Sequence, residues 1–164
     1  TKPKMFDFTM GDNYSQTGND ITQTPIWVRP QALLSDKLDD IVDNMIVEMY
    51  KYMDKFPIFL NTTVNIDAYN IQRYLPGEHF QQIHSERTSI DSLHRIFAFM
   101  TYLNDVNDGG GTEFYHQQKI IQAKKGLTIV WPADWTYTHR GCISKTETKY
   151  IITGWASYYN KTGT

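Results

Sequence analysis

The pattern of residues after Pro57 constrains this chain more than any other feature. From there on, apolar positions alternate with polar ones or form short runs rich in β-branched and aromatic side chains, which is typical of strands. The segments with this pattern are 63–75, 95–103, 112–115, 119–123, 127–131, 135–139 and 149–159. Turn-forming sequences such as Pro76-Gly77 and Arg140-Gly141 separate them. Because no helical segments alternate with the strands, the pattern predicts a mostly β, double-sheet fold of jelly-roll type.

One amphipathic helix is expected before the strands, within residues 31–56, packed on the outside of the double sheet. Ser35 is its expected N-cap. Residues 1–30 are polar and turn-rich, so we expect an N-terminal extension of loop with one short strand, and Pro25–Val28 is a further strand candidate. The apolar positions of the helix recur at steps of three and four and form one stripe: Leu34, Leu38, Ile41, Val42, Met45, Met49 and Met53.

The composition fits one globular domain spanning residues 1–164, with the jelly-roll core at 63–159. Apolar residues make up 40% and charged residues 21%, unlike a disordered chain. The net charge is −2 without a long basic run, so no nucleic-acid partner is expected. No apolar run approaches the ~20 residues of a membrane span. Cys142 is the single cysteine, which excludes an internal disulfide and favours a reducing, cytoplasmic location. The oligomeric state stays open.

His84 and Glu86 are the first candidates for a metal site. They lie two residues apart, so on a strand their side chains would project from the same face. His139 closes a second segment with strand pattern. Two imidazoles and one carboxylate form the facial set that holds non-haem Fe(II), and zinc can use the same ligands. A mixed-charge loop with incidental histidines is the alternative.

Lys149 follows His139 by ten residues and lies in an apolar segment. A lysine whose head is buried in a barrel requires an anion to offset the loss of hydration. An anionic cosubstrate would supply one. The alternative is a lysine at the edge of a strand whose head reaches water.

Four ordered stretches between Tyr74 and Trp155 resemble the prolyl 4-hydroxylase-like Fe(II)/2-oxoglutarate-dependent dioxygenases. The second stretch is the most specific, because it is close to the family's Arg…Tyr-Leu-Asn-Asp-Val…Gly-Gly-x-Thr-x-Phe segment. The stretches are YLPGEHFQQIHSE (74–86), RIFAFMTYLNDVNDGGGTEF (95–114), KKGLTIVWP (124–132), and His139 with Lys149 ten residues later, followed by YIITGW (150–155).

This resemblance implies a double-stranded β-helix (jelly-roll) core and an oxygenase that hydroxylates its substrate with release of succinate and CO2. His84, Glu86 and His139 would bind Fe(II). Lys149 would pair with the distal carboxylate of 2-oxoglutarate, and molecular oxygen is the other cosubstrate, with ascorbate as a candidate reductant. The remaining residues that the resemblance assigns to the site, around cosubstrate and substrate, are Arg95, Tyr74, Tyr102, Thr112 and Trp155.

The chain departs from the family pattern at two points. Glu86 stands where the family usually carries Asp, and three residues separate Phe80 from His84 where the family more often has two. The glutamate side chain reaches roughly 1.5 Å further than aspartate, by one carbon–carbon bond. We expect Glu86 to be a working ligand. The alternatives are a weakened iron site and a halogenase-like site in which an exogenous anion coordinates.

The expected substrate is a prolyl residue of a peptide or protein, with a small molecule or a free amino acid as the alternative. An aromatic and cationic rim near His139 suits a peptide, including proline-rich segments. The rivals from other classes are a non-catalytic jelly-roll module that binds sugar or peptide, and a cupin-like metal enzyme without 2-oxoglutarate. The residues of the expected rim are Trp131, Trp135, Tyr137 and Arg140.

Overall fold

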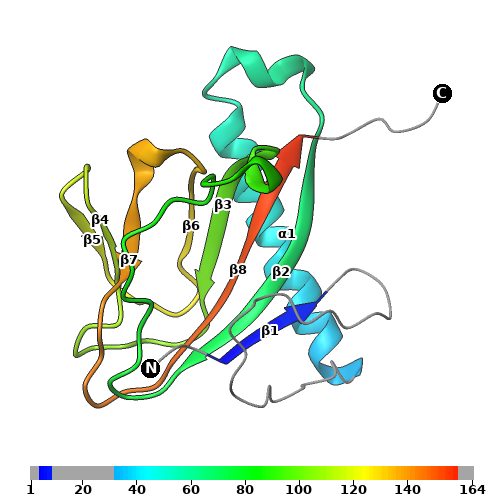
Figure 1. Cartoon of the computed structure of the whole chain (residues 1–164). Helices are drawn as coiled ribbons and strands as arrows, with labels where there is room; N and C mark the ends of the chain where they lie inside the picture. Colours follow the sequence, from blue (N-terminus) through cyan, green and yellow to red (C-terminus); the bar gives the residue numbers. More distant parts are fainter. Residues whose placement is uncertain (1–3, 9–31, 159–164) are drawn as a thin grey trace.

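The computed structural model describes residues 4–8 and 32–158, which form two antiparallel sheets and one long helix (Figure 1). The larger sheet has the strand order β1-β2-β8-β3-β6, and the smaller one has the order β5-β4-β7. This arrangement confirms the predicted jelly-roll fold. The strands are β1 (Lys4–Phe8), β2 (Val64–Tyr74), β3 (Arg95–Tyr102), β4 (Thr112–Phe114), β5 (Lys119–Ile121), β6 (Thr128–Pro132), β7 (His139–Gly141) and β8 (Lys149–Tyr158).

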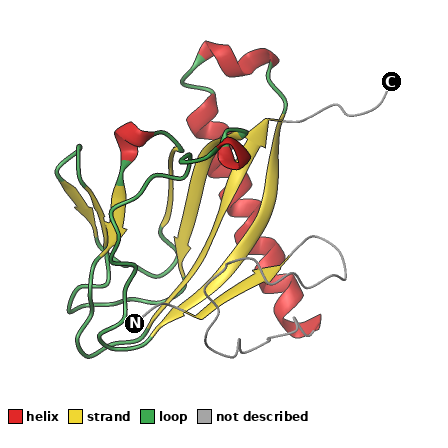
Figure 2. Ribbon diagram, in the orientation of Figure 1, coloured by secondary structure: helices red, strands yellow, loops and turns green. Residues whose placement is uncertain are grey.

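The helix α1 (Ala32–Met53) covers the outer face of the larger sheet (Figure 2). Met49 and Met53 are buried against Phe97 of β3 and Ala156 of β8. This contact confirms that the methionine end of the apolar stripe packs on a sheet. The helix begins at Ala32, so Ser35 lies inside it. The prediction that Ser35 is the N-cap was therefore wrong. The side chains of Leu34, Leu38 and Met45 lie outside the described residues.

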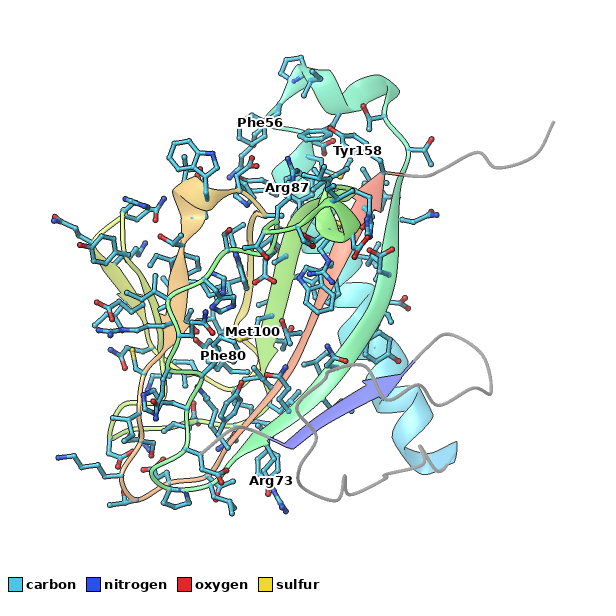
Figure 3. All side chains as sticks on the ribbon, in the orientation of Figure 1. Phe56, Arg73, Phe80, Arg87, Met100 and Tyr158 are labelled. Atoms are coloured by element: carbon cyan, nitrogen blue, oxygen red, sulfur yellow. The ribbon has the colours of Figure 1, made fainter. Side chains whose placement is uncertain are left out.

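The inner face of the larger sheet and the smaller sheet enclose the main core. Along β3, Ala98, Met100 and Tyr102 belong to this core, whereas Phe97 and Phe99 pack on the opposite face toward α1. The alternation follows from the two-residue period of a strand. Phe80, from the segment that follows β2, lies in the same space as Met100 (Figure 3). The polar residues of the site described below project into this space.

Two strand predictions need correction. Trp135–Tyr137 form a 3-10 helix rather than a strand, because the backbone N–H of Tyr137 turns back to donate to the carbonyl of Asp134 at 2.9 Å. Arg140 and Gly141, expected to form a turn, belong to β7 and pair with β4. The expected strand in the N-terminal extension is β1, which pairs with β2. Pro25–Val28 lie outside the described residues.

Two shorter elements complete the fold. Pro57–Asn61 and Ile90–Ser92 form 3-10 helices. In the described part of the chain, no helix is long and apolar enough to cross a membrane.

Candidate metal centre and adjoining pocket

Backbone pairing brings His84 and His139 together. The N–H of His84 donates to the carbonyl of His139 at 3.0 Å, and the N–H of His139 donates to the carbonyl of His84 at 2.9 Å. Their ring centroids are 4.3 Å apart. The sequence predicted that His84 and Glu86 share a strand. The structure has instead a single β-bridge at His84, opposite the first residue of β7.

Each imidazole is oriented by a carbonyl two residues before it. His84 Nδ1 lies 3.0 Å from the carbonyl oxygen of Gln82, and His139 Nδ1 lies 3.0 Å from that of Tyr137. A carbonyl oxygen only accepts, so Nδ1 carries the proton and Nε2 keeps its lone pair in the neutral ring. This is the tautomer that coordinates a metal through Nε2.

Glu86 completes the group. Its Oε1 lies 3.2 Å from His139 Nε2 and 3.7 Å from His84 Nε2. One ligand atom from each of the three residues lies within 4.8 Å of the others, close enough to hold one metal ion. The structure therefore brings together all three residues that the sequence predicted as metal ligands. Two imidazoles and one carboxylate are a donor set that fits Fe(II).

Electrostatics favours the coordinating forms of Glu86 and His84. Burial opposes the charge of Glu86, but the hydrogen bond and positive charge of His139 and the charge of His84, which both rings have when protonated, and the bond from Trp155 hold the pKa of the carboxyl below its usual value. Burial and the neighbouring His139 lower the pKa of His84. At neutral pH the site therefore holds a carboxylate beside a neutral His84.

Arg95 and Trp155 lie beside Glu86. Trp155 Nε1 donates to Glu86 Oε2 at 2.6 Å. The Arg95 guanidinium lies 3.8 Å over the centroid of the indole ring and donates from Nη1 to the Glu86 carbonyl at 3.2 Å. Both residues thus contact the carboxylate residue of the candidate metal centre.

Lys149 is the first residue of β8 and is 4% exposed. No described carboxylate forms an ion pair with it, and its Nζ lies 4.6 Å over the ring of Tyr74. Burial lowers its pKa to about 8, against a smaller opposing effect of Cys142. The alternative of a lysine head in water is wrong. A buried ammonium without a counter-charge fits an anion-binding role.

Tyr74, Tyr102 and Thr112 are also buried, but their hydroxyls already have partners. Tyr74 Oη donates to Gln72 Oε1 at 2.6 Å. Tyr102 Oη lies 2.7 Å from Thr112 Oγ1. Burial raises the pKa of Tyr102 to about 12, so its hydroxyl stays protonated at neutral pH. The contact between Tyr102 and Thr112 joins β3 of the larger sheet to β4 of the smaller one, whereas Tyr74 bonds within its own strand β2.

A cavity of about 460 Å³ adjoins the candidate metal centre. All nine residues that line the cavity are polar or ionisable, so it suits a hydrophilic ligand. The lining residues are Gln82, His84, Ser85, Glu86, Thr88, Ser89, Asp91, Ser92 and Arg95.

The expected aromatic rim is only partly present. Trp131 is buried in the core, and Arg140 is paired with Glu113, its Nε 2.6 Å from Oε2. Trp135 is 71% exposed and remains available for a partner.

Arg87 is a site-shaping residue that sequence reasoning missed. It donates from Nε and Nη2 to the Arg95 carbonyl and forms an ion pair with Asp134 at 3.1 Å. It thereby fixes the segment that carries Glu86. Its position one residue after Glu86 was the available signal. No sequence signal marked the orienting carbonyls of Gln82 and Tyr137, because every residue has a backbone carbonyl.

Comparison with solved structures finds the same fold in prolyl hydroxylases. A viral collagen prolyl hydroxylase from Paramecium Bursaria Chlorella virus-1, in its 2OG complex, aligns with a TM-score of 0.60 at 18% identity, over 82% of this chain and 78% of that one. A Pseudomonas putida prolyl-4-hydroxylase aligns with a TM-score of 0.58 at 20% identity, over 82% and 71% of the two chains.

Sequence comparison supplies the family. No curated protein matches the chain. Residues 69–157, more than half of the chain, match the 2OG-Fe(II) oxygenase superfamily, and this segment contains all three residues of the candidate metal centre. The chain therefore belongs to the 2OG-Fe(II) oxygenase superfamily, the enzymes that use Fe(II), 2-oxoglutarate and molecular oxygen.

Proposed function

We propose that the chain forms a single domain that hydroxylates a prolyl residue of a peptide or protein and releases succinate and CO2. The observation that carries the oxygenase chemistry is the convergence of His84, Glu86 and His139 within 4.8 Å, in the family's order along the chain. The likeness of the fold to a viral collagen prolyl hydroxylase and a bacterial prolyl-4-hydroxylase supports the prolyl substrate.

In this proposal His84, Glu86 and His139 hold Fe(II). When bound, Fe(II) would supply the redox chemistry with molecular oxygen as the oxidant, and 2-oxoglutarate would be the co-reductant that ends as succinate and CO2. The protein supplies two oriented imidazoles and one carboxylate. The Nδ1 atoms are hydrogen-bonded to the carbonyls of Gln82 and Tyr137. These bonds fix the orientation of both rings, so that each Nε2 lone pair stays directed toward the metal position.

Lys149 binds the distal carboxylate of 2-oxoglutarate in this proposal. The supporting observation is that its ammonium is buried with no described counter-charge. An incoming carboxylate would form a charge-assisted contact and offset the cost of burial. Tyr74, Tyr102 and Thr112 line this end of the site in this proposal; Tyr74 contacts Lys149, and all three hydroxyls are hydrogen-bonded.

Arg95 and Trp155, which both contact Glu86, complete the assigned residues. Arg95 lines the polar cavity, and its buried Nε has no hydrogen-bond partner. Arg95 would meet a polar group of the substrate through the part of its side chain that lines the cavity.

The polar cavity supports a second candidate substrate, a small hydrophilic molecule such as a free amino acid. Asp91 and Arg95 place both signs of charge on its walls. An amino acid carries both an ammonium and a carboxylate. The exposed indole of Trp135 favours the peptide, because aromatic side chains bind proline-rich segments.

The decisive experiment measures succinate release with peptides and with free amino acids, using mass spectrometry to find the hydroxylated product. We expect release to require Fe(II), 2-oxoglutarate and oxygen, with ascorbate sustaining turnover. Activity without metal or without oxygen would overturn the proposal. Turnover of free amino acids but no peptide would replace the first substrate by the second.

A matched pair of variants tests the role of Lys149. Lys149→Met keeps the length of the side chain but removes its charge, and we expect it chiefly to raise the 2-oxoglutarate concentration required for turnover. Lys119→Met, at an exposed position of β5, is the control and should leave that requirement unchanged. An unchanged requirement in Lys149→Met would remove Lys149 from this role.

A further inference from the structure

The two carboxylate oxygens of Glu86 have different surroundings. Oε1 faces the two imidazoles, 3.2 Å from His139 Nε2 and 3.7 Å from His84 Nε2. Oε2 accepts a hydrogen bond of 2.6 Å from Trp155 Nε1. The side chain of Glu86 is only 10% exposed, so water does not compete effectively for either oxygen. One oxygen is therefore directed to the metal centre, and the other is held by the indole.

The indole that holds Oε2 is itself fixed from two directions. Trp155 belongs to β8, in register with Ala98 of the neighbouring strand, so its backbone is part of the rigid sheet. On the ring face, the Arg95 guanidinium stacks at 3.8 Å from the centroid, a favourable cation–π contact. Arg95 also donates to the backbone carbonyl of Glu86. Together these two residues bind Glu86 at both its main chain and its side chain.

The length of Glu86 is what allows it to contact both partners. An aspartate at this position would draw the carboxylate back by roughly 1.5 Å, one carbon–carbon bond. A bond of 2.6 Å to Trp155 would lengthen beyond the limit of a hydrogen bond, unless the carboxylate left the imidazoles instead. Either response leaves a polar group unsatisfied in a buried site, which is unfavourable.

We propose that Trp155 is the positioning residue for Glu86, fixing it as a ligand through one oxygen, and that the Trp155 contact is the reason this site works with glutamate rather than aspartate. This inference rests on the proposed function, because it assumes that Glu86 binds the metal. It leads to an unexpected consequence: restoring the family's usual aspartate weakens metal binding in this chain.

Trp155→Phe tests the hydrogen bond, with Trp131→Phe as its matched control. Both changes remove an indole N–H on the inner side of the sheet while keeping an aromatic ring. Trp131 Nε1 is buried without a hydrogen-bond partner, and its ring packs 5.0 Å from that of His139. The control thus makes the same chemical change, next to the metal centre, without losing a bond.

Isothermal titration calorimetry measures the dissociation constant of Mn(II), a metal ion that can be handled without excluding oxygen. Loss of a partner that orients a metal ligand typically weakens affinity by about 10–100-fold, and we expect this range for Trp155→Phe. Trp131→Phe should stay within about threefold of the wild type, as it removes no bond to a ligand. Equal effects of the two variants would overturn the inference. Thermal melting without metal identifies any variant that fails to fold.

The second test uses Glu86→Asp and the double variant Glu86→Asp/Trp155→Phe. Its expected result differs from that for a tryptophan with only a structural role. Glu86→Asp should bind Mn(II) at least about tenfold more weakly than the wild type, with the Trp155 bond already lost. Adding Trp155→Phe should then cost nothing more, so the two effects are non-additive. Additive losses, or wild-type affinity in Glu86→Asp, would overturn the inference. A wild-type protein that binds no Mn(II) or Fe(II) would overturn the proposed function as well, so the two failures are distinguishable.

Discussion

His84 and His139 exchange both of their backbone hydrogen bonds, at 3.0 and 2.9 Å, although fifty-odd residues of chain separate them. This reciprocal pairing, a single β-bridge, places the two imidazoles with their ring centroids 4.3 Å apart. The two donors are therefore fixed by main-chain geometry, and the metal centre is prearranged before any ion arrives.

Replacing either imidazole should remove metal binding without unfolding the protein. The backbone pair survives in His84→Ala and in His139→Ala, because it uses only main-chain atoms. We expect Mn(II) affinity to fall by more than about 100-fold, beyond the loss expected for an orienting residue. Titration calorimetry measures this, with His116→Ala on the exposed β4–β5 turn as the control. Retained affinity in either variant would exclude that residue as a ligand.

Binding of 2-oxoglutarate should weaken at alkaline pH because of Lys149. Burial lowers its pKa to about 8, so the free protein loses this proton above pH 8, whereas pairing with a carboxylate requires it. Above pH 8, binding of 2-oxoglutarate is therefore accompanied by uptake of a proton by Lys149. Affinity should be flat below pH 8 and then fall by up to about tenfold per pH unit.

This pH dependence is measured by calorimetry of Mn(II)-loaded protein between pH 7 and 9.5. Lys149→Met should bind 2-oxoglutarate weakly and with no such slope. A wild-type affinity that does not change with pH would contradict the prediction.

Gly154 should tolerate no larger side chain. A Cβ there would lie 2.6 Å from Phe99 Cζ and 3.0 Å from Tyr69 Cβ, on the side of β8 that packs toward α1. Gly154→Ala should lower the free energy of unfolding by roughly 1–3 kcal/mol through overpacking. Urea unfolding measures the loss. In a Phe99→Leu background, where the ring is shorter, the same change should cost less; an equal cost would show that the ring is not the obstacle.

Asp108 should stabilise the turn before β8 in an acid-sensitive way. Its carboxylate accepts hydrogen bonds from Ser144 Oγ, from the N–H groups of Lys145 and Thr146, and from Thr146 Oγ1, and the Ser144 and Thr146 bonds lower its pKa to about 2. A lowered carboxyl pKa stabilises the fold above the unfolded pKa of 3.8 and loses that effect as the pH falls through about 2.

Asp108→Asn should therefore melt at a lower temperature than the wild type at pH 7, and the difference should shrink toward pH 2. Asp54→Asn removes the same charge from an exposed side chain without a described hydrogen bond or ion pair. It should leave the melting temperature unchanged. A gap between Asp108→Asn and the wild type that stays constant down to pH 2 would contradict the assignment.

The sequence predicted the sheets well because strand patterning reflects burial. In β3, nearly every residue is buried, and its continuous apolar run was readable without a structure. The failure at Trp135–Tyr137 has a local cause. Aromatic and β-branched residues favour strands in general, but the turn at Asp134 closes a 3-10 helix before the chain reaches β7. Pattern alone does not record where a chain turns.

The metal centre was predictable in its membership but not in its geometry. The spacing of His84 and Glu86 suggested two ligands, although the strand assumed for them is only a single bridge. The bond between Trp155 and Glu86 was not predictable, because it joins residues on elements far apart in sequence. Such contacts depend on tertiary packing, and no local pattern encodes them.

The pairing of β2 with β8 also determines when the site can form during synthesis. Val64 lies opposite Tyr158 and Tyr74 opposite Lys149, so the centre of the larger sheet joins early and late parts of the described chain. Such non-local pairing is slow, because a long loop must close before its contacts offset the lost entropy. When His84 and His139 have emerged from the ribosome, β8 has not yet emerged. This strand lies between β2 and β3 in the finished sheet. Until that strand emerges, the facing edges of β2 and β3 stay unpaired, and unpaired edges of this kind make a growing chain prone to aggregation.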